Sequence, residues 1–206
     1  MGAVVDGVGE LVRSDAMRKM TWANGSGITH EVAICPSGAG LADFAWRISL
    51  ADISVDADFS SFVGIERVIV LIEGEGMNLT LDGHTQPIEP LSPVHFAGES
   101  VASCTLPHGP TRDLNVMYRR DRVTCVVDIL DGSSPIEAAS EPGETLWLGV
   151  LTGSWVIETK LALALEPLDF IRIDGVARLI GDGYVARFSL RTRPTVPAPF
   201  FDVASV

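Results

Sequence analysis

Hydrophobic and polar residues alternate with a period of two along much of the chain, which is the pattern of half-buried β-strands. The segment Phe44 to Ile53 shows it clearly. Its large apolar residues share one face and its smaller or polar residues the other, namely Phe44, Trp46, Ile48 and Leu50 against Arg47, Ser49 and Ala51. We therefore expect a strand here with two faces of different chemistry.

A second segment, residues 113–120, alternates in the same way. One face carries Leu114, Val116 and Tyr118, and the other carries Asp113, Asn115, Met117 and Arg119. Turn signals rich in Gly, Pro, Asn and Asp separate such segments about every eight to twelve residues, a spacing typical of β-sandwiches and barrels. The pattern predicts an all-β fold.

The stretch Val68 to Gly98 reads as three strands joined by a Gly-Glu-Gly bend and an Asp-Gly turn. A weaker copy runs from Leu146 to Gly175, and matching glycines are separated by nearly equal numbers of residues. This indicates a duplicated β-unit. The polar, Pro-bounded segment 133–143 is the best candidate for a linker, so we expect a first unit over residues 1–130 and a second, degenerate unit over 131–206.

Composition excludes some classes of partner. The 206 residues include 15 Lys and Arg against 27 Asp and Glu, a net charge of -12, which disfavours nucleic-acid binding. No apolar run reaches membrane-spanning length, and the start lacks the basic and apolar regions of a signal peptide. We expect a cytoplasmic protein with no membrane partner.

The histidines do not suggest a metal site. Val68 to Gly98 resembles the hairpin core of cupins, the double-stranded β-helix (jelly-roll) barrels. Cupin metal sites use a His-x-His pair, a Glu and a late His, but His30, His84, His95 and His108 are scattered here. We therefore expect no metal and no other cofactor.

Polar residues on otherwise apolar strands are the best candidates for a site. Arg47, Asp113, Asn115 and Arg119 interrupt apolar strands, and Thr29 and Glu31 share a face. Inside a barrel they could hold a small acid or amide, because Arg binds carboxylates and Asn both donates and accepts hydrogen bonds. The alternative is an internal salt-bridge network, for example Arg47 with Glu31 or Asp113.

Four motifs in order carry a closer likeness, to the HutD/Ves family: residues 22–31, 44–51, 59–67 and 109–120. The resemblance implies a bicupin, two tandem barrels packed together, that restrains or tunes histidine utilisation in bacteria by binding an intermediate such as formylglutamate. Two departures are Ser26 in place of a usual Gly and His30 in place of a usual Arg. Cupin-like sheets often pair edge to edge, so a homodimer is also allowed.

These inferences combine into one prediction, a metal-independent protein that binds a small carboxylate metabolite. Arg47 and Arg119 would bind carboxylates, with Trp22 as a wall. The full expected ligand-binding set is Trp22, Asn24, Gly25, Thr29, Glu31, Arg47, Asp113, Asn115, Met117 and Arg119.

Two alternatives remain open. One is a metal-free isomerase or hydrolase acting on a small carboxylate, with Glu31 as its base. It is less favoured because the chain has no Gly-x-Ser-x-Gly elbow, and Cys104 is more readily explained as a buried, inert thiol. The other is a protein-binding module without a ligand.

Overall fold

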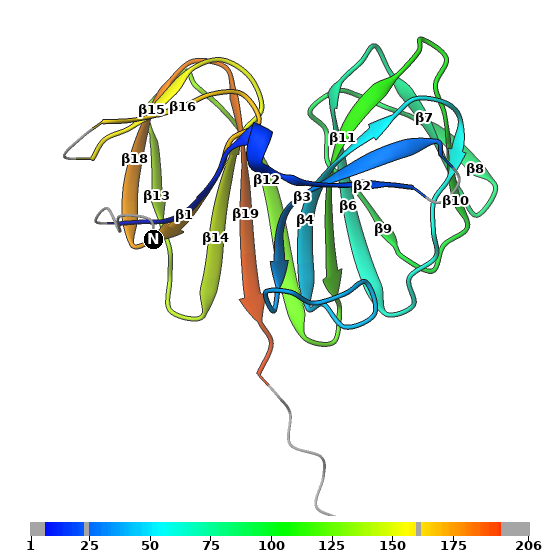
Figure 1. The fold of residues 1–206 in the computed structure, drawn as a ribbon, viewed down its shortest axis with the longest axis horizontal. Helices are drawn as coiled ribbons and strands as arrows, with labels where there is room; N and C mark the ends of the chain where they lie inside the picture. The colour runs from blue at the N-terminus through cyan, green and yellow to red at the C-terminus, as the bar shows by residue number, and fades with distance from the viewer. Residues whose placement is uncertain (1–6, 23–24, 160–161, 195–206) are drawn as a thin grey trace, which may run out of the picture.

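The computed structural model describes residues 7–22, 25–159 and 162–194. Within them the chain is almost entirely β-structure, with one 3-10 turn at Ser14–Ala16, so the predicted all-β class is confirmed. The strands form four antiparallel sheets, two in each half of the molecule (Figure 1). No helix among these residues is long and apolar enough to cross a bilayer.

The N-terminal half pairs a six-stranded sheet with a four-stranded sheet. The six-stranded sheet has the order β2 (Arg18–Thr21), β3 (Gly27–Cys35), β4 (Trp46–Ile53), β11 (Thr111–Arg119), β6 (Ile65–Glu73) and β9 (Val94–Ala97). The four-stranded sheet has the order β5 (Ala57–Asp58), β10 (Ala102–Thr105), β7 (Met77–Leu81) and β8 (His84–Ile88).

The C-terminal half pairs a five-stranded sheet with another four-stranded sheet. The larger has the order β1 (Gly7–Val12), β17 (Phe170–Asp174), β14 (Glu144–Val150), β19 (Tyr184–Thr192) and β12 (Val123–Asp131). The smaller has the order β13 (Ile136–Ala139), β18 (Val176–Gly181), β15 (Trp155–Ile157) and β16 (Leu163–Leu165).

Strand pairing crosses the division expected at residue 130. The first strand, β1, pairs with β17, and β12 pairs with β19, so both lie in the sheet of the C-terminal half. The segment 133–143 is not a plain linker either, because Ile136 and Ala138 alternate into the core as part of β13. The chain instead passes between the halves twice, between β1 and β2 and again in the short turn between Arg119 and Val123.

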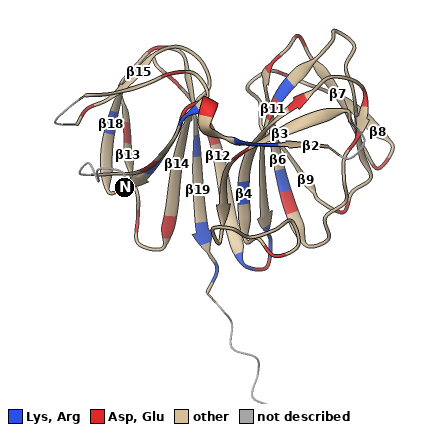
Figure 2. Ribbon diagram, in the orientation of Figure 1, with Lys and Arg blue, Asp and Glu red and all other residues tan. Residues whose placement is uncertain are grey.

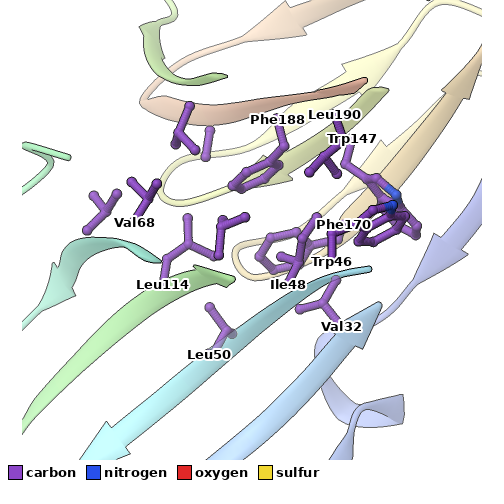
Figure 3. Close-up of a cluster of buried hydrophobic side chains, with 14 of the residues drawn as sticks. Val32, Trp46, Ile48, Leu50, Val68, Leu114, Trp147, Phe170, Phe188 and Leu190 are labelled. Atoms are coloured by element: carbon purple, nitrogen blue, oxygen red, sulfur yellow. The ribbon is translucent and has the colours of Figure 1, made fainter. Parts of the chain in front are cut away.

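The two large sheets stack face to face, and their contact is the largest apolar cluster of the molecule (Figure 3). Trp46, Ile48 and Leu50 enter it from β4, which confirms the predicted apolar face of that strand. Phe44 differs: it precedes the strand and packs on the other side, against Ile65 and Met117.

The C-terminal half contributes aromatic residues to this interface. Trp147, Phe170 and Phe188 are almost fully buried, and the two phenylalanine rings stack with centroids 6.2 Å apart. Gly149 makes this possible, because a Cβ there would lie 2.3 Å from the ring of Phe170. Full burial of one large apolar side chain contributes about 1.5–3 kcal/mol, so this interface joins both halves into one packed body.

We predict that truncating this interface is costly. Ile48→Ala removes a fully buried side chain and should lower the free energy of unfolding by about 2–5 kcal/mol in urea denaturation. Ile180→Ala removes the same atoms from a side chain that is 42% exposed, and should change stability by no more than about 0.5 kcal/mol. Equal losses in the two variants would contradict the proposed importance of the interface.

Candidate functional site

The strand register places polar side chains in rows on the inner face of the six-stranded sheet. Met117, on the central strand β11, has Arg47 of β4 and Arg67 of β6 as its two cross-strand partners. Residues opposite one another in neighbouring strands point to the same face. The two arginines therefore flank Met117 inside the N-terminal half (Figure 2 marks the basic positions of β4 and β6).

The next two rows follow at intervals of two residues. Asn115 is flanked by Ser49, which in turn pairs with Glu31. Asp113 lies between Ala51 and Leu71, at the start of the apolar core between the two sheets of this half. The inner face thus changes along the strands from charged and polar rows to mainly apolar rows, in which Asp113 is the charged exception.

A cavity of about 430 Å³ lies over the polar rows. Its floor consists of Arg47, Ser49, Arg67, Asn115 and Met117. Loop residues 58–62 and the strand β2 surround it, bringing Phe59, Phe62, Met20 and the exposed Asp58. The volume is within the range of small-molecule sites.

One wall of the cavity is held by Trp22. Its indole Nε1 donates a hydrogen bond of 2.8 Å to the hydroxyl of Thr29, and its ring meets Phe59 edge to face with centroids 6.2 Å apart. Both contacts fix the plane of the indole, so it presents a rigid apolar surface to the cavity.

The charge of Arg47 is compensated. Its Nε donates to a carboxylate oxygen of Glu31 at 2.9 Å, and Arg18 lies 3.7 Å from the other oxygen of that carboxylate. The internal salt bridge considered for Arg47 is therefore present with Glu31. It leaves Glu31 behind Arg47 and outside the cavity lining.

Arg67 is different, because its guanidinium is buried without a partner. Only 4% of the residue is exposed, and across the described residues no ion pair or hydrogen bond reaches it; its Nε is buried without an acceptor. Its guanidinium carbon lies 5.0 and 5.1 Å from the centroids of Phe59 and Phe96. Burial lowers the pKa of Arg67 to about 10, against the opposing effect of Asp113, so the group stays charged at neutral pH.

Further polar groups on the inner face of β11 lack partners. Asp113 is 0% exposed, and neither carboxylate oxygen has a hydrogen-bond partner in the described part of the chain; the same holds for Oδ1 of Asn115. Burial raises the pKa of Asp113 to about 7, with Arg67 lowering it and Asp52 raising it further. A carboxyl at the edge of an apolar core is desolvated without hydrogen bonds, which explains the direction of this shift.

The predicted ligand-binding residues divide into two groups. The cavity is lined by Trp22, Thr29, Arg47, Asn115 and Met117. Outside its lining are Glu31, Asp113, Gly25 and Arg119, and Asn24 lies outside the described residues. Gly25 shapes the turn before β3, with a φ of 72° and its N–H donating to the carbonyl of Trp22.

Arg119 does not occupy the predicted place beside a ligand. Its Nε donates to the carbonyl of Phe44 at 2.9 Å, a second nitrogen donates to the carbonyl of Ala42, and the guanidinium lies 6.0 Å from the Phe44 ring. It is one row beyond Met117, where the loop before β4 crosses the end of β11. Its donors therefore hold that loop.

His30, the departure from the family pattern, also lies away from the cavity lining. Its Nε2 is 2.7 Å from one carboxylate oxygen of Asp52, and the other oxygen of that carboxylate accepts from Nε of Arg112. Among the described residues, no three His, Cys, Asp or Glu side chains gather in a way that could hold a metal ion.

Sequence reasoning missed Arg67 as a site residue. The signal was the one that identified Arg47: a charged residue among inward apolar positions, here Ile65, Ile69 and Leu71. The apolar run Val68 to Ile72 that follows Arg67 predicts a buried strand, and it masks the single charge at its start.

Comparison with known proteins gives consistent matches. The family model described as HutD matches residues 14–185. An uncharacterized 21.2 kDa protein in the hutC 3′ region of Pseudomonas putida is 34% identical over 186 residues, which cover 88% of this chain and 95% of that protein. Protein Ves of Citrobacter koseri is 37% identical over 153 residues, 72% of this chain and 77% of Ves.

Solved structures agree. The structure of HutD from Pseudomonas fluorescens SBW25, in a formate condition, has a TM-score of 0.77 and 32% identity, covering 90% of this chain and 99% of that one. A conserved protein of unknown function from Pseudomonas aeruginosa PAO1 also has a TM-score of 0.77, with 28% identity, covering 90% of this chain and 98% of that one.

We predict that Arg67→Met does not destabilise the protein. The lowered pKa of Arg67 corresponds to a cost of about 3 kcal/mol for keeping it charged. The two cation–π contacts each stabilise the charged guanidinium by about 1 kcal/mol. The free energy of unfolding in urea should therefore be unchanged or rise by about 1–2 kcal/mol.

The matched control is Arg47→Met, which leaves Glu31 without its nearest partner. It should lower the free energy of unfolding by about 1–3 kcal/mol. A loss of stability in Arg67→Met as large as that in Arg47→Met would contradict the description of Arg67 as lacking an ion-paired or hydrogen-bonded partner.

Asp113→Asn should change the pH dependence of stability. Since the pKa of Asp113 is about 7 in the folded protein and near 3.8 when unfolded, the folded state holds the extra proton between these values. This group therefore lowers wild-type stability as pH rises from 4 to 7. The free energy of unfolding of the variant, relative to that of the wild type, should increase by up to about 4 kcal/mol over that range and stay constant above it. Urea denaturation from pH 4.5 to 8 measures it; parallel curves would contradict the assignment.

Proposed function

The chain belongs to the HutD family, and from this premise we propose that it binds a small carboxylate metabolite in the cavity of its N-terminal half and thereby acts in the control of histidine utilisation. The observation that carries the proposal is Arg67, a buried cation in the cavity lining that has no anionic partner within hydrogen-bonding distance in the described chain.

A carboxylate ligand fits this charge. An unpaired buried guanidinium is costly, and an anion placed against it offsets that cost through charge-assisted hydrogen bonds. Arg47, two strands away in the same row, offers its remaining donors to the same space. The ligand would enter with its charge toward Arg67 and its apolar portion against Trp22 and Met117.

The polar floor supplies orientation. Asn115 has an unpartnered Oδ1 and can accept an N–H, and Ser49 adds a hydroxyl. A metabolite with both a carboxylate and an amide or amine N–H satisfies these groups better than a simple fatty acid. Formylglutamate has this chemistry, and it is the ligand type that the family resemblance implies.

The names of the relatives support the metabolic setting. The Pseudomonas putida relative is named for its position in the hutC 3′ region, and a family structure was obtained in a formate condition. Formate is the simplest carboxylate. Metal-independent binding is proposed because the cavity offers arginine, amide and hydroxyl donors for an anion.

Calorimetric titration with formylglutamate, urocanate and histidine tests the proposal. We expect at least one to bind, and we expect Arg67→Met to weaken that binding at least about 100-fold, since it removes a charge-assisted contact in a desolvated site. Arg47→Met should weaken it about 10-fold, because Glu31 already shares that charge.

The control is Arg178→Met, an exposed arginine of β18 that pairs with Glu137 and Glu158. It should leave the affinity unchanged. Absence of heat and of any thermal shift with all three compounds would count against the proposed function, as would equal loss of binding in Arg178→Met and Arg67→Met.

A further inference from the structure

We propose that Asp113 is the internal counter-charge of Arg67, and that it takes up one proton when a carboxylate binds in the cavity. The inference rests on the proposed function of that cavity. It adds a second event to binding: the site accepts an anion and a hydrogen ion together.

The position of Asp113 supports this role. It lies on the inner face of β11, two residues from Asn115 and four from Met117, both of which line the cavity. It has no solvent exposure and no hydrogen-bond partner among the described residues. No hydrogen bond from the described chain and no exposure to solvent therefore stabilises its ionised form, and a change of charge in the cavity acts directly on its protonation.

The charged and titratable groups around Asp113 come from three strands. Arg67 of β6 is the cation that acts on it, Asp52 of β4 adds negative charge, and Cys104 of β10 is a buried thiol whose pKa is raised to about 11. Asp52 is itself bound by Arg112 and His30. Arg67 is thus the cation whose field favours an ionised Asp113.

A bound carboxylate changes this balance. It shares the charge of Arg67 and adds a second negative charge to the same desolvated region. The ionised form of Asp113 then loses its stabilisation. The Asp113 side chain therefore takes up a proton from solvent and becomes a neutral carboxylic acid. The balance is one proton taken up for the one ligand carboxylate that shares the charge of Arg67; any second carboxylate of the ligand adds its own negative charge.

Because the pKa of Asp113 is about 7 without the anion and higher with it, proton uptake accompanies binding between those values. Affinity should therefore fall as pH rises above 7, by up to about tenfold per pH unit where the linkage is complete. A ligand carboxylate alone does not titrate in this range.

The experiment is calorimetric titration of the full chain with formylglutamate at pH 7.5 in phosphate, Hepes and Tris. The slope of the observed enthalpy against the ionisation enthalpy of the buffer gives the protons taken up. We expect an uptake of up to about 0.8 proton, because an Asp113 with a pKa of about 7 is already partly protonated at pH 7.5, and no uptake in Asp113→Asn. That variant should still bind, with an affinity that no longer falls between pH 7 and 8.5.

His30→Gln is the matched control, because the His30 imidazole contacts Asp52, the other carboxylate that acts on Asp113. It should retain the proton uptake. Binding by the wild type without proton uptake, or uptake that disappears in His30→Gln, would overturn the inference while leaving the proposed function intact. Absence of binding would instead overturn the proposed function. If Asp113→Asn fails to fold, the wild type and His30→Gln still decide the question.

Discussion

The packing of the six-stranded sheet on the five-stranded sheet is the constraint on which the rest of the structure depends. It buries the outer faces of both large sheets, with Ile48, Leu114 and Phe188 almost fully enclosed. Since successive residues of a strand point to opposite faces, every strand of the N-terminal sheet then has its remaining residues directed inward. The interface thus decides which residues can form a site: Arg47, Arg67, Asn115 and their neighbours in register.

With the centre of the outer face apolar, the inner face could carry polar groups at a tolerable cost. The apolar core between the sheets of the N-terminal half begins at Ala51 and Leu71, level with Asp113. Asp113 lies at that boundary and Arg67 lies two rows away in the cavity lining, and desolvation acts on both. Groups held in such unfavourable surroundings are more common at functional sites than in scaffolds. Here one is a cation against a cavity and the other an acid directly beneath it.

The sequence predicted the strands and their faces well, because a period of two is a local signal. The alternation in residues 46–51 and 113–118 appears in the structure as expected. It could not predict that β1 pairs with β17, since this contact joins residues more than 150 positions apart. Nor could it distinguish Arg119 from Arg47: both are arginines on the inner side, but a crossing loop occupies the donors of Arg119. Whether the two halves are copies of one cupin barrel stays a prediction.

The unequal chemistry of the halves argues that only one of them holds the site. Among the described residues, the N-terminal half supplies every buried polar or charged side chain except Asp169. Asp169 is fully satisfied, accepting from Arg13, the N–H of Ser14 and the N–H of Glu166. Polar groups on the matching face of the five-stranded sheet also pair among themselves, as Arg187 does with Asp128. The C-terminal half therefore has no counterpart of the unpaired Arg67. Its role is to bury the outer face of the six-stranded sheet. This burial stabilises the fold while the inner face of the same sheet carries charged groups.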